Sequence, residues 1–152
     1  MNKIIVGFTA LFFAISASAQ MANPVQWTFT SKKIADKTYE IHMTASITGG
    51  KYHLYSQTNN ADAPSTSITF IKNPLLTMQG KVKEVGKLIS KMEPVFGFKV
   101  NYYMNTVDFV QLVKSKVTAP ASVKGSVEYI VCDDKQCLPP KTIDFDVKVG
   151  GN

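Results

Sequence analysis

The sequence predicts an all-β protein, an antiparallel β-sandwich, and three observations lead to that prediction. Apolar and polar residues alternate strictly in several separate segments, which is the pattern of strands with one buried and one solvent-facing side. Gly, Asn and Pro signals for turns separate these segments. After the N-terminal apolar run, no segment of ten or more residues carries an apolar stripe at helical spacing. We therefore expect strands and turns with little helix.

Four segments carry the clearest alternation, and shorter β-rich runs lie between them. The alternating segments are 39–47, 96–102, 127–131 and 143–149. The shorter runs, rich in β-branched and aromatic residues, are 27–30, 52–55, 67–71 and 107–113. The turn signals are Gly49-Gly50, Asn59-Asn60, Asn73-Pro74, Gly80, Ala119-Pro120 and Pro139-Pro140. Seven to nine short strands at this spacing predict an immunoglobulin-like sandwich, without the Cys, Trp, Cys core signature of true immunoglobulin domains.

The first 19 residues have the composition of a secretory signal peptide. Lys3 precedes an apolar run over 4–15, and small residues ending at Ala19 form an A-x-A cleavage site. A run of about 12 residues is too short for a membrane span, which needs roughly 20. We therefore expect residues 1–19 to be removed. Residues 20–152 are expected to form a single domain that is soluble, monomeric and not inserted in a membrane.

The charge of the chain does not predict a nucleic acid partner. The formal net charge is +6, and all 17 basic residues are lysines. Bidentate recognition of phosphate or guanine relies on arginine, and these lysines are scattered singly rather than grouped. We interpret the basic charge as a solvated surface.

The chain has two cysteines, Cys132 and Cys137, at the neck of a predicted hairpin. Cys132 ends the first strand, residues 133–136 form the turn, and Cys137 begins the return. Residues that face each other across such a neck can reach the Cα separation that a disulfide needs. Export to an oxidising compartment makes pairing of the two thiols the expected state.

The spacing of this pair leaves two interpretations open, a structural staple and a thiol-disulfide exchange site. A loop of about six residues gives a staple worth roughly 2 kcal/mol, which a domain of this size does not need. Exchange requires an accessible thiolate and a second thiol that resolves the mixed disulfide. Asp133 and Asp134 disfavour a thiolate and Lys135 favours it, so reaction would depend on a more reactive cysteine of the partner.

The hairpin resembles a known family. The stretch Val131-Cys132-Asp-Asp-Lys-Gln-Cys137-Leu-Pro-Pro is similar to the active-site hairpin of the N-terminal periplasmic domain of the thiol:disulfide interchange protein DsbD. Related stand-alone domains are called disulfide bond corrector proteins. The segment 50–56 resembles the family's Gly, aromatic, Leu-Tyr strand, and 93–97 resembles its cap loop. The resemblance extends from Trp27 to Val149.

The resemblance implies a periplasmic immunoglobulin-like domain that acts as a protein-disulfide reductase component. It would receive electrons from a membrane thiol transporter and pass them to thioredoxin-fold partners without a cofactor. Cys137 corresponds to the cysteine that attacks the partner disulfide, and Cys132 to the one that resolves it. The remaining correspondences are Phe96 or else Val95 as the shielding cap residue, Glu93 as the acidic residue near the thiols, and Tyr52 and Tyr55 as the aromatic strand beside them.

Two features depart from the best-known members of the family. Those members have one more residue between the cysteines, and they carry membrane and thioredoxin-like segments that we do not expect in this protein. We therefore expect the electron donor to be another polypeptide. The alternative function is a non-catalytic secreted binding module whose disulfide is structural.

The other candidate residues predict less. His42 lies on the polar side of its strand and is interpreted as a surface residue, whereas His53 lies within the strand that the family places beside the thiols. Neither histidine has carboxylates at metal-ligand spacing, and the methionines are not closely spaced, so we expect no metal site.

Overall fold

The computed structural model describes residues 23–93 and 96–151, and within these ranges the chain forms strands and turns without a helix. The strands are β1 (Val25–Ala35), β2 (Thr38–Ile47), β3 (His53–Tyr55), β4 (Ser67–Phe70), β5 (Leu76–Gly86), β6 (Ile89–Glu93), β7 (Phe98–Tyr103), β8 (Thr106–Ser115), β9 (Ala121–Tyr129), β10 (Val131–Cys132) and β11 (Lys141–Val149). The predicted all-β class is confirmed. The predicted signal peptide, residues 1–19, lies outside the described residues.

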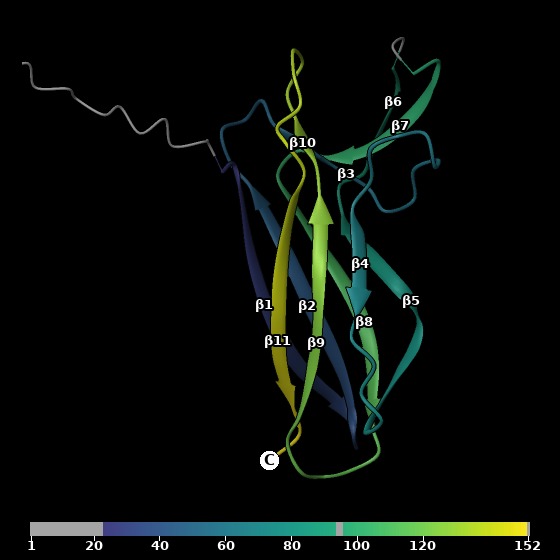
Figure 1. Ribbon diagram of the computed structural model, residues 1–152, viewed down its shortest axis with the longest axis vertical. Helices are drawn as coiled ribbons and strands as arrows, with labels where there is room; N and C mark the ends of the chain where they lie inside the picture. The colour runs from purple at the N-terminus through teal and green to yellow at the C-terminus, as the bar shows by residue number, and fades with distance from the viewer. Residues whose placement is uncertain (1–22, 94–95, 152) are drawn as a thin grey trace, which may run out of the picture.

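Two antiparallel sheets form the sandwich. One has the strand order β1-β2-β8-β5 and the other β11-β9-β4. Figure 1 shows their strands running along the long axis of the molecule, with β11, β9 and β4 in front of β1, β2 and β8. The inward-facing side chains of both sheets make one core, which includes Ile41, Phe109, Val127 and Phe145. The predicted β-sandwich is therefore confirmed.

The core follows from the alternation in the sequence. Every second residue of β2 and β8 is buried over most of each strand, and β9 has the same pattern. Met43 and Phe109 oppose each other across β2 and β8, and both are fully buried. Gly125 of β9 lies beneath the Phe145 ring, where an added Cβ would lie 2.6 Å from a ring carbon. Only glycine fits there, because this contact is far inside van der Waals distance.

A third sheet closes one end of the sandwich. Its strand order is β10-β3-β7-β6, and Figure 1 shows these short strands gathered at the end of the long axis where the cysteine hairpin lies. Strands β5 and β6 were not predicted. The Gly80 turn signal lies inside β5, where Gly80 has a φ of 68° and the register with β8 shifts. The glycine therefore marks an irregularity within a strand rather than the end of one.

A half-buried carboxylate ties the third sheet to the sandwich. Glu84 of β5 accepts hydrogen bonds from the Ser56 hydroxyl at 2.7 Å, the Gln57 backbone N–H at 2.7 Å and the Tyr103 hydroxyl at 2.8 Å. Burial, and then the bond to Glu84, raise the pKa of the Tyr103 hydroxyl. These bonds fix the segment that follows β3 and the end of β7 against β5, so the third sheet has a defined position on the sandwich.

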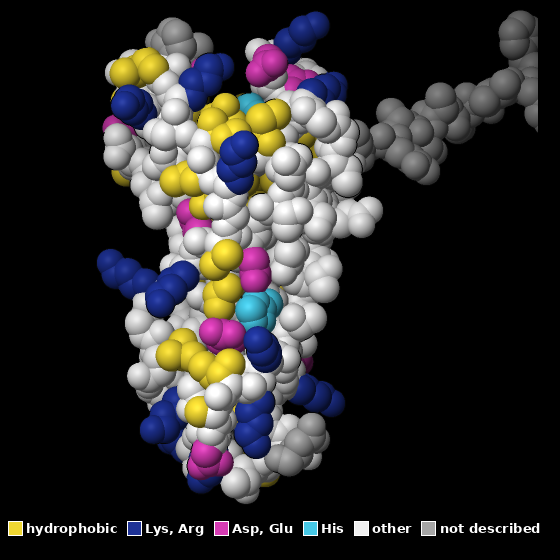
Figure 2. Space-filling view, turned by 180° about the vertical axis from the view of Figure 1, so that it is seen from behind, with side chains coloured by type: hydrophobic (Ala, Val, Ile, Leu, Met, Phe, Trp, Pro, Cys, Tyr) yellow, Lys and Arg dark blue, Asp and Glu magenta, His cyan; other side chains and the backbone are white. Residues whose placement is uncertain are grey.

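The surface carries dispersed charge. Figure 2 shows lysines spread over one face among acidic and apolar side chains, without a continuous basic stripe. This distribution agrees with a solvated surface, because nucleic acid sites group their basic side chains. In the described part of the chain, no helix is long and apolar enough to span a bilayer.

Candidate functional site

Cys132 and Cys137 form a disulfide at the end of the molecule that carries the third sheet. The two residues oppose each other as an isolated antiparallel bridge, with their Cα atoms 3.9 Å apart. The Leu138 backbone N–H donates to the Val131 carbonyl at 2.8 Å and closes the neck of the hairpin. The predicted pairing across the neck is therefore confirmed.

The turn between the cysteines is organised by Asp133. Its carboxylate accepts hydrogen bonds from the backbone N–H groups of Lys135 and Gln136, both at 2.9 Å, and its own N–H donates to the Gln136 carbonyl. These bonds, together with the ammonium of Lys51 at 3.3 Å, lower the pKa of the Asp133 carboxyl. The acidic residues that disfavour a thiolate are therefore partly compensated, because Asp133 is engaged by the turn and by Lys51.

The two cysteines differ in exposure. Cys132 is 2% exposed, whereas Cys137 is exposed on the hairpin. A thiol exchanges with a protein disulfide only when its sulfur can approach the partner in line. Cys137 is therefore the accessible residue of the pair, and Cys132 is enclosed by the fold.

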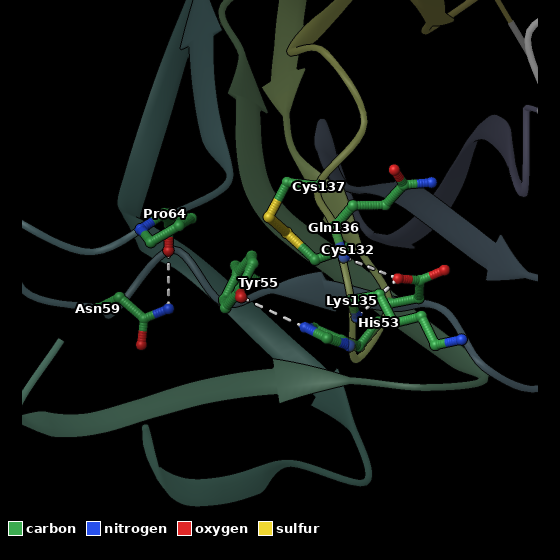
Figure 3. The surroundings of a disulfide bond; sticks show 9 residues. His53, Tyr55, Asn59, Pro64, Cys132, Lys135, Gln136 and Cys137 are labelled. Atoms are coloured by element: carbon green, nitrogen blue, oxygen red, sulfur yellow. Dashed lines mark hydrogen bonds between the residues drawn. A yellow bond between two sulfur atoms is a disulfide. The ribbon is translucent and has the colours of Figure 1, made fainter. Parts of the chain in front are cut away.

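A second, smaller hydrophobic cluster lies beneath the pair. Cys132 packs with the buried side chains of Tyr55 from β3 and Val100 from β7, and with Ala63 from the loop after β3. Partly buried side chains pack against this cluster, namely Phe96, Phe98, Tyr102 and Ile130. In this cluster burial raises the pKa of the Tyr55 hydroxyl. Asn59 fixes the loop after β3 by donating a hydrogen bond to the Pro64 carbonyl (Figure 3). Its side chain also forms hydrogen bonds with the backbone of Asn101.

The predicted cap loop is the tip of the β6–β7 hairpin. The Glu93 carbonyl accepts hydrogen bonds from the N–H groups of Phe96 at 3.1 Å and Gly97 at 2.9 Å. Gly97 has a φ of 72°, which returns the chain into β7 without strain. The Phe96 ring stacks on Phe98 with centroids 5.7 Å apart. Val95, the alternative cap residue, lies outside the described residues.

The residues of the candidate site line an open groove of about 530 Å³. Its lining includes both cysteines, the turn between them, and side chains of β3, β6 and the cap. The lining residues are His53, Tyr55, Lys91, Glu93, Phe96, Cys132, Asp133, Asp134, Lys135, Gln136 and Cys137. The structure thus places Glu93, Phe96 and Tyr55 in one groove with the two cysteines.

Tyr52 lies elsewhere. Its ring packs against the main core, and the Lys51 ammonium lies 4.8 Å from its centroid. Tyr52 does not line the groove, and the Lys51 ammonium beside its ring also bridges to Asp133 of the hairpin. The assignment of Tyr52 to the surround of the thiols remains a prediction.

His53 contributes more to the groove than the sequence predicted. It pairs directly with Cys132 across β3 and β10, and its Nε2 lies 3.2 Å from the Tyr55 hydroxyl (Figure 3). The centroid of its ring lies 4.6 Å from that of Tyr102. Burial lowers the pKa of the His53 imidazole. The register between distant strands places it there, and no local signal in the sequence gives that register.

The other histidine lies away from the pair, within the first sheet. His42, interpreted as a surface residue, lies on the polar side of β2 and is half-buried, and its Nδ1 lies 2.6 Å from the Asp108 carboxylate on the neighbouring strand. In residues 23–93 and 96–151, no three His, Cys, Asp or Glu side chains gather in a way that could hold a metal ion.

Comparison with known proteins identifies the fold. The structure is similar to the Neisseria meningitidis DsbD N-terminal domain in its reduced form, with a TM-score of 0.51 and 20% identity over 82% of this chain and 86% of that one. The complex between the DsbD and PilB N-terminal domains of Neisseria meningitidis gives a TM-score of 0.48 and 16% identity over 88% and 91%. No protein-family model and no curated protein matches the sequence. The similarity to the first of these structures shows that the chain has the fold of the DsbD N-terminal domain, as the resemblance of its cysteine hairpin predicts.

Proposed function

We propose that this protein is a periplasmic thiol-disulfide exchange protein that reduces partner disulfides through Cys132 and Cys137. The observation that carries the proposal is the unequal exposure of a pair closed by a short loop. An exposed Cys137 and a buried Cys132 supply an attacking sulfur and a resolving sulfur. The sequence resemblance of the hairpin and the fold described above support the same assignment.

The reaction is a two-electron exchange. The Cys137 thiolate attacks one sulfur of the partner disulfide, so a mixed disulfide forms and one partner thiolate leaves. The Cys132 thiolate then attacks the Cys137 sulfur, and the second partner thiolate leaves. Two thiols of this protein are oxidised to a disulfide, the partner disulfide is reduced to two thiols, and the protons pass from the former to the latter.

The exchange reaction requires an electron donor and an electron acceptor. We propose a membrane thiol transporter as the electron donor that restores the two thiols, and periplasmic thioredoxin-fold proteins as acceptors. The groove beside Cys137 carries both acidic and basic side chains and the Phe96 ring. Such a mixed surface suits a transient partner, because weak redox complexes bury small, partly polar interfaces. No cofactor enters the reaction.

Single-cysteine variants test the assignment of roles. Cys132→Ser leaves the exposed attacking thiol, so it is expected to trap a mixed disulfide with an oxidised thioredoxin-fold protein. Cys137→Ser leaves only the buried thiol and is expected to trap little. The matched control is the double variant, which cannot form an adduct. Equal trapping by both single variants would contradict the assignment.

The reduction potential tests the function itself. A disulfide used in exchange equilibrates with thioredoxin-fold partners, whereas structural disulfides have potentials below about −300 mV. The potential is measured by equilibration with defined thiol buffers, followed by alkylation and mass analysis. A potential well below that value, together with no exchange with any partner tested, would identify a structural bond and favour the binding-module alternative.

A further inference from the structure

His53 lies beside the buried cysteine rather than the exposed one. It opposes Cys132 directly in the antiparallel pairing of β3 with β10. Directly opposed residues project to the same side of a sheet, with Cβ atoms about 5 Å apart. Cys137 bridges to Cys132 from the other side of β10, so Cys132 stands between the imidazole and the exposed cysteine. Both His53 and Cys132 line the groove.

The imidazole is held in place by two aromatic rings. The Tyr102 ring lies 4.6 Å from it, and the Tyr55 ring meets it edge-on at 5.1 Å with an interplanar angle of 82°. Figure 3 shows the hydrogen bond between His53 Nε2 and the Tyr55 hydroxyl below the disulfide. Tyr55 belongs to the same buried cluster as Cys132. A ring fixed in this way has a defined position relative to the sulfur.

The surroundings favour a neutral imidazole that can accept a proton. Partial burial lowers its pKa, so the ring is mainly uncharged near neutral pH. The titratable and charged groups around it are the Tyr55 hydroxyl from its own strand, Tyr102 from β7, whose ring packs against it, Lys91 and Glu93 from β6, and Asp133 and Asp134 from the hairpin. Asp134 and Glu93 act against the burial effect and stabilise the imidazolium once it forms.

We infer that His53 accepts the proton of the Cys132 thiol in the resolving step. The proton passes from sulfur to the imidazole, directly or through one water of the open groove, and the resulting thiolate attacks the Cys137 sulfur of the mixed disulfide. The bond between Cys137 and the partner breaks, and the departing partner thiolate takes the proton back from the imidazolium. The inference rests on the proposed function, because only exchange requires a resolving thiolate.

A coupled thiol and imidazole have a characteristic dependence on pH. Between the two apparent pKa values of the pair, the population of the thiolate–imidazolium form does not change with pH. The resolving rate is therefore expected to be constant over that range. A cysteine without a base is a thiolate in proportion to hydroxide concentration, so its rate falls about tenfold for each pH unit below its pKa.

The test separates the two steps with a small disulfide probe. Fully reduced protein is mixed with dithiobis(nitrobenzoate), and release of the coloured thiolate is followed by stopped flow from pH 5 to pH 9. The first phase is attack by Cys137 and depends on probe concentration. The second phase is attack by Cys132 within the mixed disulfide and does not. For the wild type, the second phase is expected to have a plateau in pH.

His53→Gln keeps the size and hydrogen-bonding capacity of the side chain but removes the base. Its second phase is expected to lose the plateau and to be about tenfold slower at pH 7, with the first phase within about twofold of wild type. His42→Gln, in the first sheet, is the matched control and is expected to change neither phase. His53→Phe, which keeps the aromatic packing, replaces the glutamine variant if that variant does not fold.

A second phase that keeps its plateau in His53→Gln or His53→Phe would overturn the inference, as would equal slowing of both phases. This outcome is distinct from failure of the proposed function, because the probe needs no partner. A separate outcome is failure of partner exchange while the plateau is present in the wild type and lost in the variant. That result would support proton transfer to His53 and contradict the proposed exchange function.

Discussion

Reduction of the Cys132–Cys137 bond is expected to lower the free energy of unfolding by no more than about 2 kcal/mol. The entropy gained by the unfolded chain on opening a loop of about six residues sets this value. The structure makes it an upper limit, because other bonds already hold the hairpin. Asp133 bonds the backbone of the turn, and Leu138 bonds the Val131 carbonyl across the neck.

Urea unfolding with and without a thiol reductant measures this difference. The midpoint is expected to fall while the denaturant dependence stays unchanged, because the same surface is exposed on unfolding. The thermodynamic cycle supplies an independent check. A loss of 2 kcal/mol corresponds to a reduction potential about 40 mV more negative in the folded than in the unfolded protein. A loss above about 4 kcal/mol would refute the reasoning and make the bond a principal staple of the domain.

Three further predictions concern the residues around the site. Glu84→Gln is expected to lower the free energy of unfolding in urea by about 1–3 kcal/mol, because it replaces a carboxylate that accepts three hydrogen bonds. Glu128→Gln at an exposed position is the control, and equal effects of the two substitutions would contradict the prediction. The Asp133 pKa is lowered in the fold, so its stabilisation is present above about pH 4 and is lost as pH falls through the folded value. The urea midpoints of wild type and Asp133→Asn should therefore converge at low pH, and a constant difference would argue against this. Phe96→Ala is expected to speed oxidation of the reduced pair by hydrogen peroxide severalfold with a nearly unchanged urea midpoint, and an unchanged oxidation rate would show that Phe96 does not shield the pair.

Local patterns predicted much of the fold. The period of two in 39–47 and 143–149 gives strands with one buried side, and these segments lie within β2 and β11. The region of β5 and β6 was not predicted, because most of its side chains are exposed and its apolar residues do not alternate over a long run. A glycine inside β5 also has the local signature of a turn.

Local sequence patterns also predicted part of the candidate site. Cys132 and Cys137 are five positions apart, so a hairpin brings them together without help from distant strands. Glu93, Phe96 and Tyr55 were assigned by resemblance, and the structure gathers them at the groove. Tyr52, assigned in the same way, faces the main core instead. Successive residues of an extended segment point to opposite sides of the sheet. One residue can therefore face the groove while its neighbour in the sequence faces the main core.

The sequence by itself determined the β class, the hairpin and the pairing of the two cysteines, because each depends on residues close together in the chain. Only the tertiary structure decided which cysteine is exposed and which is buried, because the cluster beneath Cys132 comes from three distant segments. Only the tertiary structure decided, too, which residue lies opposite Cys132 in the sheet. The pairing of β3 with β10 brings together His53 and Cys132, about 80 positions apart in the chain, and only long-range strand register fixes such a contact.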